Sequence, residues 1–142
     1  MFISVTRLRV RSFVYLPEFI WRTFKSASHA EHTRGFLGGK MLINAKNVYW
    51  TLTAWDGDAA MNQFRTAAAH RAAMPKLLNF CDEASVVHWS QETSELPSWE
   101  ESHRRMVTEG RSSKVNHPSP DQLARQIAPP RPSRLEKLLK SR

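Results

Sequence analysis

The segment VYWTLTAW, residues 48–55, constrains the fold more than any other part of the chain. It is rich in β-branched and aromatic residues, which favours a strand. Alternate residues of a strand point to opposite faces of a sheet. One face then carries only apolar side chains: Val48, Trp50, Leu52 and Ala54. The other face carries two aromatic rings and two hydroxyls: Tyr49, Thr51, Thr53 and Trp55. A bulky, amphipathic face of this kind often lines a cavity or a subunit interface.

The residues before this strand predict a strand, a helix and another strand. The sequence ISVTRLRVRSF has apolar residues on both alternation faces, which fits a strand that is packed on both sides. The helix begins at Leu16 or Pro17, because proline is tolerated only near a helix start, and it ends at Gly35. GFLGGKMLIN then forms a β-hairpin with residues 48–55, with its turn at residues 44–47.

The residues after this strand predict a second helix and a last strand. Asp56 or Asp58 caps the helix. A proline inside an unbroken helix removes a hydrogen bond, at a cost of about 3 kcal/mol. We therefore expect a kink or a restart between Thr66 and Pro75. SVVHWSQE, at residues 85–92, is the last strand.

The element order is βαββαβ, which is typical of the α+β, ferredoxin-like class. We expect a four-stranded antiparallel sheet with both helices on one face. A C-terminal helix follows, because Ser98 and Glu101 form a capping-box pattern and Gly110 ends the segment. We find no further element in this domain to cover the second face of the sheet. An identical subunit is therefore expected to cover it, which gives a homodimeric α+β barrel.

The composition changes after Gly110. Residues 111–142 hold 8 Lys and Arg against 2 Asp and Glu, a net charge of +6, and five of the eight prolines lie between Pro118 and Pro132. We predict a domain at residues 1–110 and a flexible, disordered basic tail at residues 111–142. SRLEKLLKSR is compatible with a helix, but about ten residues rarely hold one in water unaided. Basic tails can bind nucleic acid, but most are only solvated, and we do not expect nucleic acid as a partner.

Other features exclude several classes of protein. Cys81 is the only cysteine, so no internal disulfide forms, and its apolar neighbours predict a core residue. No paired Cys/His spacing indicates structural zinc. Arginines interrupt the first apolar run, which is unlike a signal peptide, and no segment approaches the roughly 20 apolar residues of a membrane span. We therefore expect a cytoplasmic protein. No Ser-His-Asp set, phosphate-binding glycine loop or carboxylate pair is visible.

The stretch FRTAAAHRAAMPKL contains His70, the strongest candidate for a functional side chain. On an unbroken helix with about 3.6 residues per turn, His70 would point away from the apolar stripe that includes Met61. A break before His70 would reset this phase and turn the side chain inward. A ligand or base would also need a neutral imidazole that faces a cavity. The alternative is a histidine on the surface of the helix.

The arginines of the first strand and His88 of the last strand can each lie at the surface or face a ligand. Arg7, Arg9 and Arg11 alternate on one strand face, where solvent exposure or an ion pair with the last helix is favoured over a contact with an acidic substrate. His88 could form part of a cavity wall, but a surface position on the last strand is favoured.

Three blocks resemble the dimeric α+β-barrel superfamily: TRLRVRSFVYLPEF, GFLGGKMLINAKNVYWTLTAWDGDAAMNQFRTAAAHRAAMPKL and EASVVHW. The resemblance is strongest to uncharacterised bacterial proteins that are similar to spheroidene monooxygenase, and the wider group includes antibiotic-biosynthesis and haem-degrading monooxygenases. It covers residues 2–89, with an extension to residue 106. It implies a ferredoxin-like fold and a homodimer. It says less about the reaction, because this superfamily hosts many chemistries.

Three functional residues of the haem-degrading members can be matched to positions in this sequence. In haem-degrading members a histidine in an AH step of the second helix binds iron, and His70 in AAAHRAA matches it. Phe64 stands where those members have a haem-distorting tryptophan, and Thr6 where they have an asparagine. Two of the three positions therefore depart from the pattern, which argues against haem degradation. Haem binding by His70 stays compatible, because spheroidene monooxygenase is described as a haem enzyme and shares the AHR step.

The resemblance implies a monooxygenase-like oxidoreductase that acts on a hydrophobic polycyclic or polyene small molecule. His70 is the candidate catalytic residue and haem-iron ligand, and Phe64 and Thr6 are the candidate cofactor-binding residues. The candidate substrate-pocket residues are Tyr49, Trp50 and Trp55. Apart from haem we expect no cofactor, because members of the superfamily oxidise activated aromatics without one. The alternative is a non-catalytic dimer that binds a small molecule or haem in a regulatory role.

Overall fold

A six-stranded antiparallel sheet forms the middle layer of the molecule. The structure, a computed structural model, describes residues 1–132 and 135–142, and the side chains of all of these except residues 68 and 69. The strands, in their order across the sheet, are β5 (Arg111–Ser112), β4 (Cys81–Ser90), β1 (Phe2–Val10), β3 (Val48–Trp55), β2 (Phe36–Asn44) and β6 (Glu136–Leu139). The helices are η1 (Phe13–Tyr15), α1 (Leu16–Glu31), α2 (Asp58–Thr66), α3 (Ala68–Phe80), α4 (Trp99–Glu109) and α5 (Pro120–Ala124).

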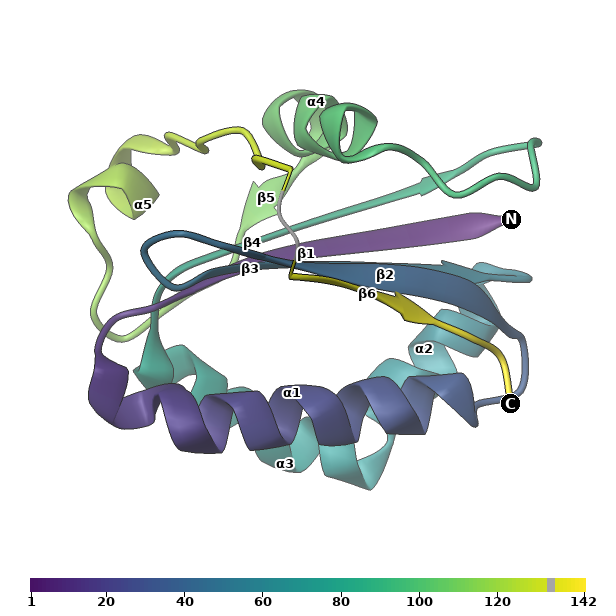
Figure 1. The fold of residues 1–142 in the computed structure, drawn as a ribbon, viewed down its shortest axis with the longest axis horizontal. Helices are drawn as coiled ribbons and strands as arrows, with labels where there is room; N and C mark the ends of the chain where they lie inside the picture. The colour runs from purple at the N-terminus through teal and green to yellow at the C-terminus, as the bar shows by residue number, and fades with distance from the viewer. Residues whose placement is uncertain (133–134) are drawn as a thin grey trace.

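Helices lie on both sides of the sheet (Figure 1). Helices α1, α2 and α3 lie on one side, and we call the sheet face toward them the cavity face. Helices α4 and α5 lie on the other side, toward the outer face. Strand β1 is central and pairs antiparallel with both β3 and β4. The ferredoxin-like βαββαβ order is thereby confirmed for the first four strands, and the predicted hairpin is β2–β3.

The prediction of four strands is wrong, because the chain beyond Gly110 adds two more. Strand β5 pairs with β4, and β6 pairs with β2, so each extends one edge of the sheet. An edge strand presents unpaired backbone N–H and C=O groups, which another extended segment can satisfy. The tail segments supply that pairing within the same chain.

The outer face is covered by the chain itself, which corrects the argument for a homodimer. Trp50 and Leu52 are 1% and 0% exposed, and they belong to one apolar cluster with Met106 of α4. Leu96, Trp99 and Ile127 pack against the same cluster. The expectation that only a second subunit could shield this face is therefore wrong, because α4 and the tail shield it.

A buried ion-pair network also lies on the outer face. Glu83 accepts hydrogen bonds from Arg7 at 2.8 Å and from Arg9 at 2.9 Å, and its second oxygen also accepts one from Ser119 at 3.0 Å. Arg7 and Glu83 are 4% and 2% exposed. The two arginines thus pair with the neighbouring strand β4, and not with solvent or the last helix as expected. The network ties the tail, through Ser119, to the sheet.

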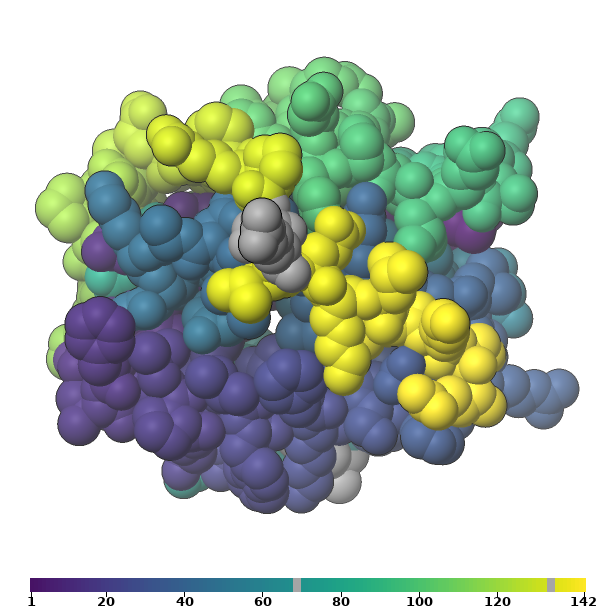
Figure 2. All heavy atoms as spheres, viewed as in Figure 1, coloured from purple at the N-terminus to yellow at the C-terminus, as the bar shows by residue number. Residues whose placement is uncertain are grey.

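The described part of the tail packs against the rest of the chain. Gln122 of α5 donates to the carbonyl oxygen of Ala84 at 3.2 Å, and the backbone N–H of Lys140 donates to the Glu31 carboxylate at 2.9 Å. Figure 2 shows the C-terminal residues, in yellow, lying across the molecule between α1 and α4. The domain boundary at residue 110 stays a prediction, and residues 133 and 134 lie outside the described part. Within the described residues, no helix is both long and apolar enough to cross a membrane.

Candidate functional site

A cavity of about 380 Å³ lies between the cavity face of the sheet and helices α1, α2 and α3, because residues of all of these line it. Strands β1 and β3 form its floor, and the helices contribute apolar walls that include Met61, Ala73 and Leu77. Tail residues also line it: Arg111 and Val115 at the β5 side, and Leu139 at the β6 side. In the space-filling view a gap stays open between the C-terminal segment and α1 (Figure 2).

Four hydroxyl side chains form a patch of two facing pairs on the cavity floor: Ser4, Thr6, Thr51 and Thr53. Ser4 pairs in register with Thr53, and Thr6 with Thr51. Directly paired residues share one face of a sheet, so the four hydroxyls are neighbours. Thr53 accepts a hydrogen bond from Trp55 Nε1 at 2.9 Å. The other three hydroxyls have no partner among the described residues, so they are free to bond a ligand or water.

A helix break brings His70 into the cavity. Helix α2 ends at Thr66, Ala67 has extended backbone (φ −63°, ψ 149°), and α3 starts at the next residue. The predicted restart between Thr66 and Pro75 is thus confirmed, and Pro75 is accommodated inside α3. The break resets the helical phase, and His70 lines the cavity.

The environment of His70 favours a neutral imidazole. Burial lowers its pKa, the positive charges of Arg65 and His29 lower it further, and a backbone contact with Arg65 partly opposes them. The Nδ1 atom is buried and has no hydrogen-bond partner among the described residues. The ring centroid lies 5.3 Å from that of Phe64. At neutral pH, this side chain can therefore act as a base or as a metal ligand.

The structure brings together the three residues proposed to bind a cofactor. Thr6 lies on the floor, Phe64 on α2 and His70 on α3, and all three line the same cavity. Phe64 also contacts Trp55, at 5.3 Å between ring centroids, so its ring joins the wall to the core. Their roles stay predictions.

The three proposed substrate-pocket aromatics do not line this cavity. Trp50 lies on the outer face, buried against Trp99 and His103, because its strand phase is opposite to that of Thr51. Tyr49 and Trp55 share the cavity face, but they are 7% and 0% exposed and pack into the core at the two ends of β3. Tyr49 and Trp55 lie outside the cavity because it covers only the middle of β3, where the residues on this face are Thr51 and Thr53.

His88 is a cavity residue that the sequence analysis placed at the surface. It lies opposite Ser4 in the register, at the β4 side of the floor. Burial lowers its pKa, and the charges of Arg65 and Arg111 add to this effect. The period-two pattern of the last strand, which puts His88 in phase with Ala84 and Val86, was the signal that could have identified it.

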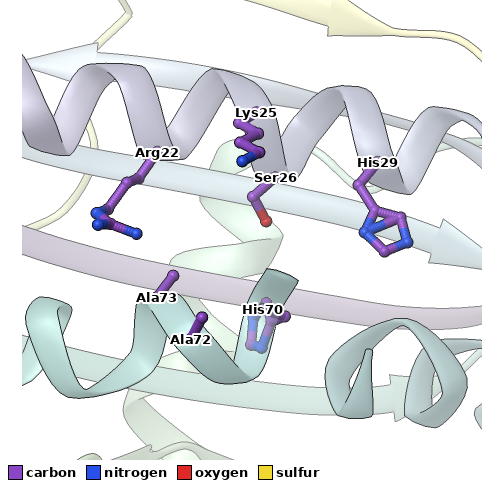
Figure 3. Close-up of a pocket in the computed structure, with 7 residues that line it drawn as sticks. All are labelled: Arg22, Lys25, Ser26, His29, His70, Ala72 and Ala73. Atoms are coloured by element: carbon purple, nitrogen blue, oxygen red, sulfur yellow. The ribbon is translucent and has the colours of Figure 1, made fainter. Parts of the chain in front are cut away.

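A smaller cavity of about 80 Å³ opens between α1 and α3, beside the main one. Figure 3 shows Arg22, Ser26 and His29 on α1, facing the first turns of α3, where His70 and Ala73 lie. Arg22, Ser26, His70 and Ala73 line both cavities. His70 therefore stands at the boundary between them, within reach of a ligand in either.

Two other kinds of chemistry find no support in the described residues. Among them, no group of three or more His, Cys, Asp or Glu side chains is placed to hold a metal ion. Cys81 is fully buried, as predicted for a core residue, and burial raises the pKa of its thiol to about 12. A thiol in that state does not act as a nucleophile at neutral pH.

Comparisons with known proteins show similarity in fold. A structure named as an antibiotic biosynthesis monooxygenase matches with a TM-score of 0.58 and 9% identity, over 66% of this chain and 100% of that one. A structure of SnoaB, a cofactor-independent oxygenase from Streptomyces nogalater, matches with a TM-score of 0.55 and 15% identity. The match covers 68% of this chain and 97% of that one. A conserved protein from Methanosarcina mazei Go1 matches with a TM-score of 0.58 and 13% identity. The match covers 64% of this chain and 92% of that one.

These matches confirm the predicted fold: the chain has the ferredoxin-like α+β fold of antibiotic-biosynthesis-monooxygenase-like proteins. No family model and no curated protein matches the sequence. The three similar structures each leave about a third of this chain unmatched.

Proposed function

We propose that the chain binds a largely apolar small molecule, of the polycyclic or polyene kind, in the 380 Å³ cavity and oxidises it with molecular oxygen. The observation that carries the proposal is the cavity itself, which has largely apolar walls, a patch of hydroxyls and the neutral imidazole of His70. Pockets for small organic ligands typically measure about 300–1,000 Å³ and combine these features. The fold of SnoaB, named as a cofactor-independent oxygenase, supports oxygen chemistry in such a frame.

His70 is the proposed general base. A neutral imidazole can take the proton of a phenolic or enolic substrate, and a low pKa keeps it neutral at pH 7. The resulting electron-rich anion can reduce oxygen itself. One oxygen atom then enters the substrate as a carbonyl, and the other leaves as water with two hydrogens from the oxidised carbon, so the step needs no added reductant. The hydroxyls of Thr6 and Thr51 would orient the polar edge of the substrate.

Haem binding is the second form of this proposal. The buried and unpartnered Nδ1 of His70, and the room beside it, fit the donor chemistry of a haem ligand. His70 would hold the haem, Phe64 and Thr6 line the same cavity and would contact it, and bound haem would supply oxygen activation. Haemin added to the purified protein should then give a Soret shift that His70→Ala abolishes and His117→Ala, an exposed control, retains.

Oxygen uptake tests the cofactor-free form directly. With anthrone as an activated polycyclic substrate, the wild-type protein should consume oxygen faster than buffer, and His70→Ala should lower the rate by about 100-fold or more. His117→Ala should match the wild type. Wild-type uptake no faster than buffer would remove this form of the proposal, as would full activity in His70→Ala.

A non-catalytic binding protein is the alternative function. It is favoured by the departures at Thr6 and Phe64 from the haem-degrading pattern and by the lack of a described carboxylate partner for His70. It predicts saturable binding of a neutral polycyclic probe, such as pyrenebutanol, without oxygen uptake. The homodimer belongs to this proposal too, and sedimentation velocity would test it. A dimer would have to use a surface other than the sheet's outer face, which is already covered.

A further inference from the structure

Every ionisable side chain that lines the 380 Å³ cavity, among the described residues, is an arginine or a histidine. Three arginines and two histidines line it, and none of the described lining residues is an aspartate or a glutamate: Arg22, Arg65, His70, His88 and Arg111. Arg22 is partly neutralised, because it pairs with Glu18 at 3.3 Å. The other two arginines carry the unbalanced charge.

Arg65, His88 and Arg111 converge from three different elements on one side of the cavity, and we call them the basic cluster. Arg111 pairs in register with Val86, so it shares the cavity face with His88 two residues further along β4. Arg65 lies in the last turn of α2, which ends at Thr66. Both guanidinium groups lie close enough to His88 to lower its pKa.

The two arginines of the basic cluster lack the carboxylate partners that several arginines elsewhere in the chain have. Arg65 donates to the Asn62 side chain at 3.0 Å, which is a neutral acceptor. No ion pair to a carboxylate is found for Arg65 or Arg111 within residues 1–132 and 135–142. By contrast, Arg7 and Arg105 pair with carboxylates at 2.8 and 2.9 Å. The cluster therefore has unused donors at the rim of an apolar cavity.

We propose that the basic cluster is an anion subsite, and that the ligand of the cavity is an amphipathic molecule with an apolar body and a carboxylate. The inference rests on the proposed binding function and adds the chemical class of the ligand. The guanidinium fork matches the planar geometry of a carboxylate, and the two forks approach from different elements. The neutral His88 between them can donate one further hydrogen bond. The apolar body then lies over the hydroxyl patch of β1 and β3, toward His70.

The tail has a part in this subsite, because Arg111 belongs to it. The pairing of β5 with β4 holds Arg111 against the cavity rim. The part of the sequence that carries most of the net positive charge thus contributes one of its arginines to ligand binding.

Paired probes test the proposal on the full-length protein. Pyrenebutyrate and pyrenebutanol share an apolar body and differ in charge. By fluorescence titration we expect pyrenebutyrate to bind about 10-fold more tightly, because hydrogen bonds to charged groups contribute more than neutral ones. Arg65→Gln and Arg111→Gln should each remove most of that preference, while pyrenebutanol binding stays unchanged. Both positions are exposed, so folding should be retained.

Arg71→Gln is the matched control, since Arg71 is an exposed arginine on α3 that does not line the cavity. It should behave as the wild type, and Arg111→Lys should keep part of the preference because it keeps the charge. Equal binding of both probes by the wild type would overturn the anion subsite and leave the proposed binding function standing. A preference for pyrenebutyrate that survives in the Arg65→Gln/Arg111→Gln double variant would also overturn the anion subsite and leave the proposed binding function standing. If neither probe binds, the binding function fails, and the subsite with it.

Discussion

The two faces of the sheet are built from the same strands, but one is filled and the other is hollow. Along β3, Leu52 and Trp50 point to the outer face and are almost fully buried, whereas Thr51 and Thr53 point to the cavity face and are half-buried. Strand β1 repeats the contrast, with Ile3 and Val5 buried and alternate residues partly open. The difference shows that one layer stabilises the domain while the other leaves room for a ligand.

The two faces also differ in whether their arginines have carboxylate partners. On the outer face, Arg7 and Arg9 share the buried carboxylate of Glu83. On the cavity face, Arg65 and Arg111 have no carboxylate partner in the described part of the chain. Charges that hold the fold together are thus compensated within the chain, and charges at the cavity are available to a ligand. Three predictions test this contrast.

The largest effect is expected where the outer face is most tightly packed. Trp50→Ala should lower the free energy of unfolding by about 3–5 kcal/mol, because it leaves a large void between the sheet and α4. Thr51→Ala, one residue away on the cavity face, should cost less than about 1 kcal/mol, since it removes atoms beside existing space. Urea denaturation followed by circular dichroism gives both values. Equal costs for the two substitutions would contradict the contrast.

Glu83→Gln should have the next largest effect, about 3 kcal/mol, because it leaves Arg7 without its buried counter-charge and leaves Arg9 only the longer ion pair with Asp82, at 3.7 Å. Burial alone would raise the pKa of Glu83, but hydrogen bonds from Arg7, Arg9 and Ser119 outweigh it, so the pKa is lowered from its usual 4.5. This carboxylate therefore stabilises the fold above about pH 4.5. That contribution is lost as the pH falls through the folded-state pKa.

The pH profile of stability separates this effect from general acid unfolding. The wild type should lose stability below about pH 4.5 more steeply than Glu83→Gln. Glu100→Gln, at an exposed position on α4, should follow the wild type. Parallel acid limbs for wild type and Glu83→Gln would show that the network does not stabilise the fold through this charge.

The smallest effect is expected from His70 on the cavity face. Its pKa is lowered from 6.5, so the folded state resists protonation, and stability should decline as the pH falls below about 6.5. His70→Asn should reduce this decline, and His88, whose pKa is also lowered, should account for part of the remainder. Thermal unfolding between pH 5 and pH 7.5 measures this pH-dependent decline in stability, with His117→Asn as the control. An unchanged slope in His70→Asn would place the imidazole in solvent.

Much of the fold could be predicted from local patterns. The alternation in residues 48–55 correctly separated a fully apolar face from one with hydroxyls over a cavity. The helix restart expected between Thr66 and Pro75 is confirmed at Ala67, but Pro75 is not its cause, because the proline lies inside α3. The site was predicted less well, because Arg65, His88 and Arg111 lie far apart in sequence and only register brings them together.

The amino-acid sequence by itself determined the order of the elements up to α4 and the phase of each strand in the central sheet. Both depend on side-chain periodicity, which acts within a few residues. Tertiary structure alone decided the two added edge strands and the cover of the outer face. Glu136–Leu139 has residues that favour a helix, yet it forms a strand, because the unpaired edge of β2 offers backbone hydrogen bonds that an isolated short helix cannot match.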